Sequence, residues 1–318
     1  MHGCARARCV TSMSDKMTLS LIGNTPLVKL DVDVKPSVYA KFEFLNPGGS
    51  IKDRSALYMV EDAERKGLLQ PGGTIVEATS GNQGIALAMI GKIKGYRVII
   101  TVPNRTSIEK VAILKAYGAE VYVCPNAASH HDPEGYVAKA QALTKQIPGA
   151  FMPDQYVNPV NADAYYRSLG PEIWQQTEGR VTHFVAGAGT CGTISGVGKY
   201  LKEQNASIHI TGVDAATSFF SSKDPKPYNV EGLGIDIISD VFNQQVVDSI
   251  ATISDDDAFS ATRKLAYKYG IMAGISSGAA MHVGMELAQG LTEKDVMVLI
   301  FADSGRAYLS KVFNQEKI

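Results

Sequence analysis

The feature that most constrains this chain is a regular alternation of short β-branched runs with longer Ala- and Leu-rich runs of helical spacing. Such alternation predicts an α/β fold with mainly parallel, twisted sheets flanked by helices, because neighbouring parallel strands are joined through a crossover helix. Two such series follow one another, so we expect two lobes. Strands are predicted at 74–78, 97–102, 120–124, 181–186, 208–213 and 296–301, and helices at 83–93, 108–117, 136–146, 194–203, 257–269 and 279–291.

A length of 318 residues suits two joined lobes, since single cores stop growing near ~250–300 residues. We place the N-terminal lobe at 17–157 and the C-terminal lobe at 158–318, and we leave open whether part of 20–45 packs with the second lobe. Residues 1–16 are polar and precede any periodic pattern, so we expect a disordered leader there.

The charges nearly cancel, with 31 Lys and Arg against 32 Asp and Glu. No basic field is available to hold a polyphosphate backbone, which disfavours nucleic-acid binding. No apolar run approaches the ~18–20 residues of a membrane span. Four cysteines form no disulfide framework, so we expect a cytoplasmic protein. His2, Cys4 and Cys9 lie in the leader without supporting neighbours, and we predict no metal site.

Three glycine-rich segments stand at or just before predicted helix starts, at 46–54, 79–84 and 187–193. A glycine loop that opens a helix presents unpaired backbone N–H groups and the positive end of the helix dipole, which together hold an anion. Three such loops are more than packing requires. We therefore predict a site for an anionic ligand at the carboxyl ends of the strands, between the lobes.

The third segment also matches the dinucleotide fingerprint, as Gly187-x-Gly189-x-x-Gly192, and Asp214 follows 22 residues later at the end of the next predicted strand. This spacing supports an NAD-binding oxidoreductase as an alternative. Against it, the fingerprint lies past the midpoint of the chain, and two threonines in the loop add hydroxyls that suit a compact monophosphate.

Lys52 directly follows a Gly-Gly-Ser-Ile turn, in the company of Asp53 and Arg54. In a shielded pocket a lysine loses its proton more readily, because desolvation disfavours the ammonium ion. The neutral amine can then form a Schiff base with a carbonyl cofactor. We therefore predict that Lys52 is chemically active and not a solvated helix residue.

With these motifs in this order, the chain resembles the fold-type II enzymes of pyridoxal 5'-phosphate, which share the architecture of the tryptophan synthase β-chain, in the cysteine synthase and cystathionine β-synthase branch. The likeness runs from about Leu21 to Lys311. The motifs that carry it are Gly23-Asn24-Thr25-Pro26-Leu27, Asn46–Arg54, Thr79–Gly84, Gly189–Thr193 and Gly274-Ile275-Ser276-Ser277-Gly278.

The resemblance implies a role for each motif. Lys52 would hold the cofactor and later take the α-proton, Asn82 would hydrogen-bond the ring hydroxyl, and Ser276 would meet the pyridine nitrogen. A neutral hydroxyl there favours departure of a β-leaving group. The implied phosphate ligands are Gly189, Thr190, Cys191, Gly192 and Thr193, and the implied substrate ligands are Thr79, Ser80, Gly81, Gln83, Gln155 and Gly232.

The chain departs from the family pattern at two positions. Gln83 stands where threonine is usual, which affects the expected hydroxyl contact to the substrate. Cys191 stands where the phosphate loop usually has glycine, so the loop either avoids a positive φ there or is slightly strained. The resemblance also implies a homodimer whose smaller, mobile N-terminal lobe closes during turnover, with the phosphate site in the C-terminal lobe.

Within the branch, stretches such as Asp154-Gln155-Tyr156, Val230–Asp236 and Asp303–Arg306 look closer to cystathionine β-synthases. We therefore predict that the protein condenses L-serine, or an O-activated serine, with homocysteine to cystathionine through an aminoacrylate intermediate. The alternative is a cysteine synthase, which makes L-cysteine from O-acetylserine and sulfide. Gln83 and Cys191 also motivate a third class, a cofactor-binding protein without turnover.

Overall fold

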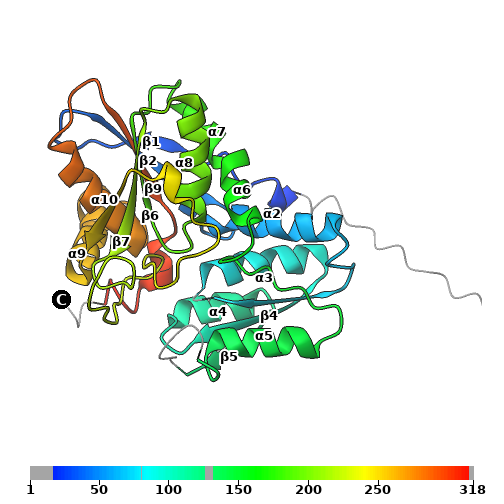
Figure 1. Ribbon diagram of the computed structural model, residues 1–318. Coiled ribbons are helices and arrows are strands. Elements are labelled where there is room, and N and C mark those ends of the chain that lie inside the picture. The colour runs from blue at the N-terminus through cyan, green and yellow to red at the C-terminus, as the bar shows by residue number, and fades with distance from the viewer. Residues whose placement is uncertain (1–16, 80, 126–131, 315–318) are drawn as a thin grey trace, which may run out of the picture.

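The computed structural model describes residues 17–79, 81–125 and 132–314, so the predicted leader at 1–16 and the site candidate Ser80 lie outside the described residues. The chain forms two lobes, each built on its own sheet (Figure 1). Within the described part of the chain, no helix is both long enough and apolar enough to cross a membrane.

The larger sheet has the strand order β1-β2-β9-β6-β7-β8 and is parallel except at its edge, where β1 runs antiparallel to β2. Residues 27–42 therefore pack with the C-terminal half of the chain, although the lobe boundaries themselves stay a prediction. The strands are β1 (Leu27–Lys29), β2 (Ser37–Phe42), β6 (His183–Gly187), β7 (His209–Ala215), β8 (Ser249–Ile253) and β9 (Val296–Phe301).

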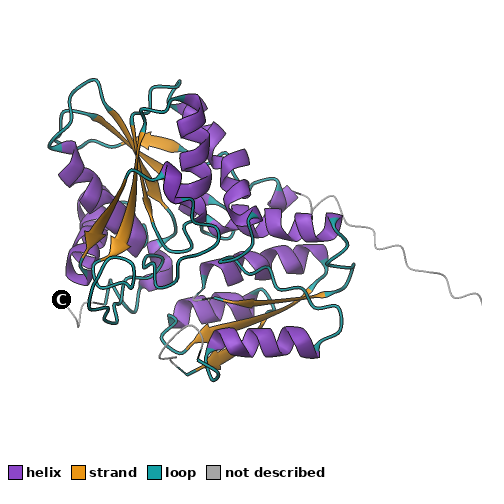
Figure 2. Ribbon diagram, in the orientation of Figure 1, coloured by secondary structure: helices purple, strands orange, loops and turns teal. Residues whose placement is uncertain are grey.

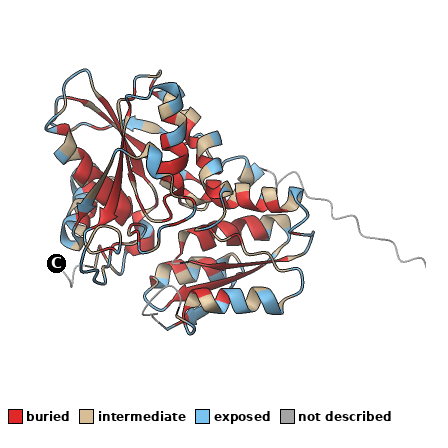
Figure 3. Ribbon diagram, viewed as in Figure 1, coloured by how far each residue is buried: buried red, intermediate tan, exposed pale blue. Residues whose placement is uncertain are grey.

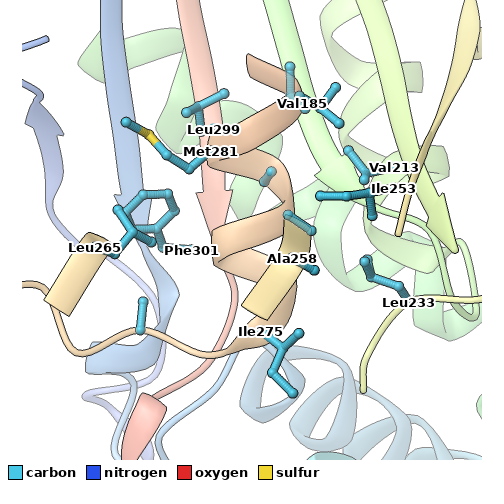
Figure 4. Packing of buried hydrophobic residues seen from close by; sticks show 14 of the residues in the cluster. Val185, Val213, Leu233, Ile253, Ala258, Leu265, Ile275, Met281, Leu299 and Phe301 are labelled. Carbon is cyan, nitrogen blue, oxygen red and sulfur yellow. The ribbon is translucent and has the colours of Figure 1, made fainter. Parts of the chain in front are cut away.

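Helices cover both faces of the larger sheet, because side chains alternate along its strands and both sides are apolar. Val185 and Leu299 pack in the cluster beneath α9 and α10 (Figure 4), whereas Phe184 and Val298 pack towards α7 and α8. The helices of this lobe are α6 (Val160–Arg167), α7 (Leu169–Gln176), α8 (Gly192–Gln204), α9 (Asp255–Tyr269) and α10 (Ile275–Ala288), with the short 3₁₀ helices η1 (Glu43–Leu45), η2 (Gln244–Val246) and η3 (Gly305–Tyr308).

The smaller sheet contains three parallel strands in the order β3-β4-β5. Ile75 and Ile100 pack against α3, and Val76 and Ile99 pack against α5 on the other side, so this sheet is also a buried middle layer (Figures 2 and 3). Its elements are β3 (Thr74–Ala78), α3 (Asn82–Lys94), β4 (Arg97–Pro103), α4 (Ile108–Ala116), β5 (Glu120–Cys124) and α5 (Tyr136–Gln146). Helix α2 (Lys52–Arg65) contacts both α3 and α6 and so joins the two lobes.

The predicted α/β class is confirmed, and several elements have their predicted bounds, among them β3, β5, α5 and β9. One helix was placed too late: α10 begins at Ile275, four residues before the predicted start at 279. The sequence Ser276-Ser277-Gly278 suggested a loop because these residues are weak helix formers. Burial of this turn against the larger sheet outweighs that preference.

For α2 a helix start was expected near the segment 46–54 but no bounds were predicted, and α6, α7, β1, β2 and β8 were not predicted. Helix α7 contains Gly170 and Pro171, which are weak helix formers, but both lie in its first turn, where a missing N–H costs nothing. Strands β1 and β2 are too short to give a clear period, at three and six residues.

A buried cluster of charges fixes the start of α2 to the larger lobe. Arg54 Nε donates to Glu43 Oε2 over 2.7 Å, and Arg54 Nη1 donates to Glu172 Oε1 over 2.6 Å. Lys41 Nζ adds a contact of 2.8 Å to Glu172 Oε2. Burial alone would raise the pKa of Glu172, but the hydrogen bonds and charges of Arg54 and Lys41 outweigh it and hold the pKa at about 2.

We predict that Arg54→Met lowers the free energy of unfolding by about 3–5 kcal/mol, because it leaves two carboxylates buried without their main partner. The matched control is Arg97→Met, which removes a solvent-exposed ion pair with Glu120 and should cost no more than ~1 kcal/mol. Urea unfolding of both variants measures the difference, and equal losses would contradict the role given to the cluster.

Candidate active site

The first turns of α2, α3, α8 and α10 meet beyond the carboxyl ends of β3, β6 and β9. The turn that precedes α2 is attached to the end of β9, because Ile51 N donates to Ala302 O over 2.8 Å. Ala302 N in turn donates to Ser277 Oγ of α10 over 3.1 Å. Residues that lie up to 250 positions apart in the chain therefore share one site.

Lys52 is half-buried at the first position of α2. Desolvation of the amine lowers the pKa of Lys52 to about 8, and the acidic groups of Cys191 and Asp303 oppose this shift only in part. Among the described residues, no hydrogen-bond acceptor or carboxylate pairs with Lys52 Nζ. A substantial fraction of this amine is therefore neutral near physiological pH and free to react.

The loop after β6 forms a cradle at the N-terminus of α8. Within the described residues, the backbone N–H groups of Gly189, Thr190 and Cys191 have no protein acceptor. Gly189 also lies close to another chain segment, since a Cβ there would be 3.2 Å from Gly232 O. Unpaired donors at the N-terminus of a long helix are suited to hold a phosphate.

Cys191 adopts φ = +61°, so the strained alternative of the two considered for this position is the one observed. The side chain is buried, and burial raises the pKa of the Cys191 thiol to about 12. The thiol thus stays protonated beside Lys52. It fills space at the base of the loop and brings no charge to it.

Ser276 lies in the first turn of α10, with two glycines beside it. A Cβ on Gly187 or on Gly232 would lie 3.6 Å from Ser276 Cβ, so both backbones approach this hydroxyl closely. Ser276 therefore faces the space between the end of β6 and the segment that contains Gly232. The hydroxyl that Ser276 presents here is neutral.

Asn82 begins α3 and donates from Nδ2 to Asp303 Oδ2 over 2.6 Å. Asp303 follows β9 and also accepts from the Tyr308 hydroxyl over 2.5 Å. Burial raises the pKa of Asp303, although the charge of Lys110 and these hydrogen bonds oppose the shift. Asp303 thus orients the amide of Asn82.

The segment predicted to bind the substrate carboxylate follows β3. Thr79 Oγ1 accepts from Gly81 N over 3.2 Å and thereby shapes the turn. Gly81 has φ = +145°, and a Cβ there would lie 2.4 Å from Lys110 Cδ, so only glycine fits. Gln83 is 1% exposed, and Gln155 is buried as well.

Two buried polar residues that the sequence did not single out hold Gln155 in place. Glu77 on β3 accepts from the backbone N–H groups of Asp154, over 2.9 Å, and Gln155, over 3.4 Å. Asn161 on α6 donates to Gln155 O over 2.7 Å and to Thr190 Oγ1 over 3.2 Å. Asn161 therefore connects the Gln155 turn to the cradle loop.

Lys110 on α4 of the smaller lobe forms polar contacts with the larger lobe. Its Nζ lies 2.6 Å from Glu231 Oε2 and 3.0 Å from the Tyr308 hydroxyl. Glu231 also pairs with Lys311 of the larger lobe. Burial would raise the pKa of Glu231, but the charges of Lys110 and Lys311 outweigh it and lower the pKa. The lobes are therefore in close contact beside the site.

Comparison with known proteins agrees with this geometry. Residues 18–303 match the family model described as "Pyridoxal-phosphate dependent enzyme". The chain belongs to this family. Its relatives include a cystathionine β-synthase of Apis mellifera, 44% identical over 93% of this chain and 61% of the relative, and a cysteine synthase of Staphylococcus aureus, 42% identical over 91% and 94%. A solved structure titled O-acetylserine dependent cystathionine beta-synthase, from Helicobacter pylori, has a TM-score of 0.87 and 39% identity over 92% of this chain and 97% of that one.

The chain spans between 55% and 63% of the length of the cystathionine β-synthases that it matches, and nearly all of the matching cysteine synthase. The prediction of a pyridoxal-phosphate enzyme with this fold is confirmed. The residues present fit that cofactor: an unpaired, desolvated amine for its aldehyde, free backbone donors for its phosphate, and a neutral hydroxyl at Ser276.

The dinucleotide alternative is wrong for this family member, and the structure gives the physical reason. Asp214 is fully buried and accepts from Ser218 Oγ and Ser221 Oγ, each over 2.5 Å, and from the backbone of Ala215 and Ile235. These bonds satisfy the carboxylate inside the lobe, so it has no capacity left for a ribose hydroxyl. Within the described residues, no group of three or more His, Cys, Asp or Glu is arranged to hold a metal ion.

We expect pyridoxal phosphate to attach to Lys52 of the cofactor-free protein with a pH midpoint near 8, because burial makes the amine neutral well below the ordinary lysine value of ~10.4. Borohydride reduction at a series of pH values, followed by mass spectrometry of the Lys52 peptide, measures this midpoint. Lys66→Ala, on the exposed end of the same helix, should leave the result unchanged, whereas Lys52→Ala should abolish the label. A midpoint above 10 would contradict the desolvation argument.

Proposed function

We propose that this protein catalyses pyridoxal-phosphate-dependent β-replacement on L-serine or an O-activated serine, and that its preferred reaction condenses this amino acid with homocysteine to cystathionine. The observation that carries the proposal is the desolvated, unpaired amine of Lys52 between the cradle loop and Asp303. The relatives named cystathionine β-synthase and cysteine synthase support the reaction class.

The cofactor, when bound, supplies an aldehyde for the substrate amine and a ring that accepts the electron pair of the α-carbon. The protein's own residues do the rest. Gly189, Thr190, Cys191, Gly192 and Thr193 would hold the phosphate, Asn82 the ring hydroxyl and Ser276 the ring nitrogen. Lys52 Nζ, once released, would take the α-proton and later return it.

The substrate carboxylate would be bound by Thr79, Ser80, Gly81, Gln83 and Gln155, with Gly232 beside the side chain of the substrate. The contact of Lys110 with Glu231 brings this segment against the larger lobe. Closure of the lobes would therefore exclude water while the α-proton is off the substrate.

The identity of the leaving group distinguishes serine from an O-activated serine as the substrate. Hydroxide from serine needs a proton as it departs, whereas acetate leaves unaided, and the Helicobacter pylori structure is titled as O-acetylserine dependent. A cysteine synthase, which uses O-acetylserine and sulfide, is the second candidate, favoured by the relative of matching length. A cofactor-binding protein without turnover is disfavoured, because Lys52, Asn82 and Ser276 all have the surroundings that catalysis requires.

The resemblance further supports a cytoplasmic homodimer, and we propose both. The near-neutral charge supports small-molecule partners over nucleic acid.

A paired kinetic assay tests the reaction. We expect kcat/KM for serine with homocysteine, or for O-acetylserine with homocysteine, to exceed that for O-acetylserine with sulfide. Cystathionine and cysteine are quantified separately by mass spectrometry, with Lys52→Ala as the inactive control. A clear preference for sulfide would assign the protein to the cysteine synthases instead.

A further inference from the structure

A chain of buried hydrogen bonds links the cradle loop to the substrate segment through Tyr165, a residue of α6 that the proposed mechanism does not use. The Thr193 hydroxyl bonds to the oxygen of Tyr165. The Tyr165 hydroxyl lies 3.2 Å from Ser55 Oγ, and Ser55 Oγ lies 3.2 Å from Gln83 Oε1. The chain thus crosses the first turn of α8, then α6, α2 and the first turn of α3.

Each member of this chain is more than nine-tenths buried. Tyr165 and Ser55 are 0% exposed, Gln83 is 1% and Thr193 is 8%. Water therefore cannot replace the partners, and the further acceptors within reach are two backbone carbonyls: Ile51 O, 3.4 Å from the Tyr165 hydroxyl, and Lys52 O, 3.3 Å from Ser55 Oγ. Ser55 lies one turn after Lys52 on α2, so the chain passes along the same face of that helix.

The direction of the donors decides which end of the Gln83 side chain is free. Ser55 Oγ accepts from Tyr165 and donates to Gln83 Oε1 over 3.2 Å, with Lys52 O as a second acceptor at 3.3 Å. The carbonyl side of the amide is therefore held by Ser55. Gln83 Nε2, the donor side, is buried and has no acceptor among the described residues.

A buried donor without an acceptor is costly, so a ligand that supplies one binds with a large advantage. Gln83 follows Asn82 and lies in the segment proposed to bind the substrate carboxylate. An amide that offers only N–H groups selects a ligand group that only accepts, and a carboxylate is such a group.

We propose that Tyr165 is a positioning residue for substrate recognition: through Ser55 it holds the Gln83 amide with its N–H groups towards the carboxylate of the bound amino acid. This inference rests on the proposed function, because it uses the same substrate segment. It also explains how Gln83 can bind the substrate at a position where threonine is usual. The longer side chain of glutamine is held at its carbonyl oxygen by the Ser55 hydroxyl.

The test measures binding apart from turnover. L-Alanine has the amino and carboxylate groups of serine but no leaving group, so its Kd is read from the change in the visible band of the bound cofactor. We expect Tyr165→Phe and Ser55→Ala each to raise this Kd about tenfold or more, the size of a lost hydrogen bond to a charged group. For serine, KM should rise by a similar factor while kcat changes less than about twofold.

Two controls separate positioning from folding. Tyr166→Phe alters the neighbouring tyrosine, whose hydroxyl bonds to Glu203 at the surface, and should leave Kd unchanged. In a Gln83→Thr background, Tyr165→Phe should no longer affect Kd, whereas any loss in the Tm of the cofactor-free protein should be the same in both backgrounds.

An unchanged Kd in Tyr165→Phe and Ser55→Ala would overturn this inference, as would the same rise in Kd in the Gln83→Thr background. A wild-type protein that takes up no pyridoxal phosphate would overturn the proposed function as well. A wild type that binds L-alanine, with variants that bind it equally, would overturn only the role of Tyr165.

Discussion

Removal of one amine from water is the constraint on which the rest of this structure depends. Desolvation lowers the pKa of Lys52, and the turn before this residue is attached to the chain just after β9 by the hydrogen bond from Ile51 N to Ala302 O. Arg54, two positions later, is satisfied by Glu43 and Glu172 of the larger lobe, which holds the first turn of α2 in place. The buried ion cluster thus fixes the position of the first turn of α2, and desolvation makes the amine of Lys52 easier to deprotonate.

Some of this arrangement can be predicted from the sequence because it is encoded locally. Glycine loops before helices and a lysine after a tight turn indicated the loop that we propose as the phosphate site and the desolvated amine of Lys52. The roles of Asp303, Lys110 and Tyr165 could not be predicted in this way, since their partners lie far away in the chain, as with Lys110 and Tyr308, 198 residues apart. The signal available for Asp303 was a carboxylate two residues after the end of the apolar strand β9.

The dinucleotide motif illustrates the limit of spacing as an argument. Gly187, Gly189 and Asp214 have the expected separations, and the strands and helix around them form as the motif requires. What spacing does not reveal is whether the carboxylate is still free. Two serines of the following loop and the backbone amides of Ala215 and Ile235 occupy Asp214, so the same pattern serves to fold a loop and not to bind a ligand.

The ion pair between Lys110 on α4 and Glu231 of the larger lobe affects how easily the two lobes can separate. The Glu231 carboxylate lies between the ammonium groups of Lys110 and Lys311. The Lys311 side chain is 31% exposed, so dissolved ions can reach the Lys311–Glu231 pair. Parting the lobes would hydrate all three charges, and added salt stabilises separated charges more than paired ones. Opening of the lobes, as proposed for turnover, would therefore become easier as ionic strength rises.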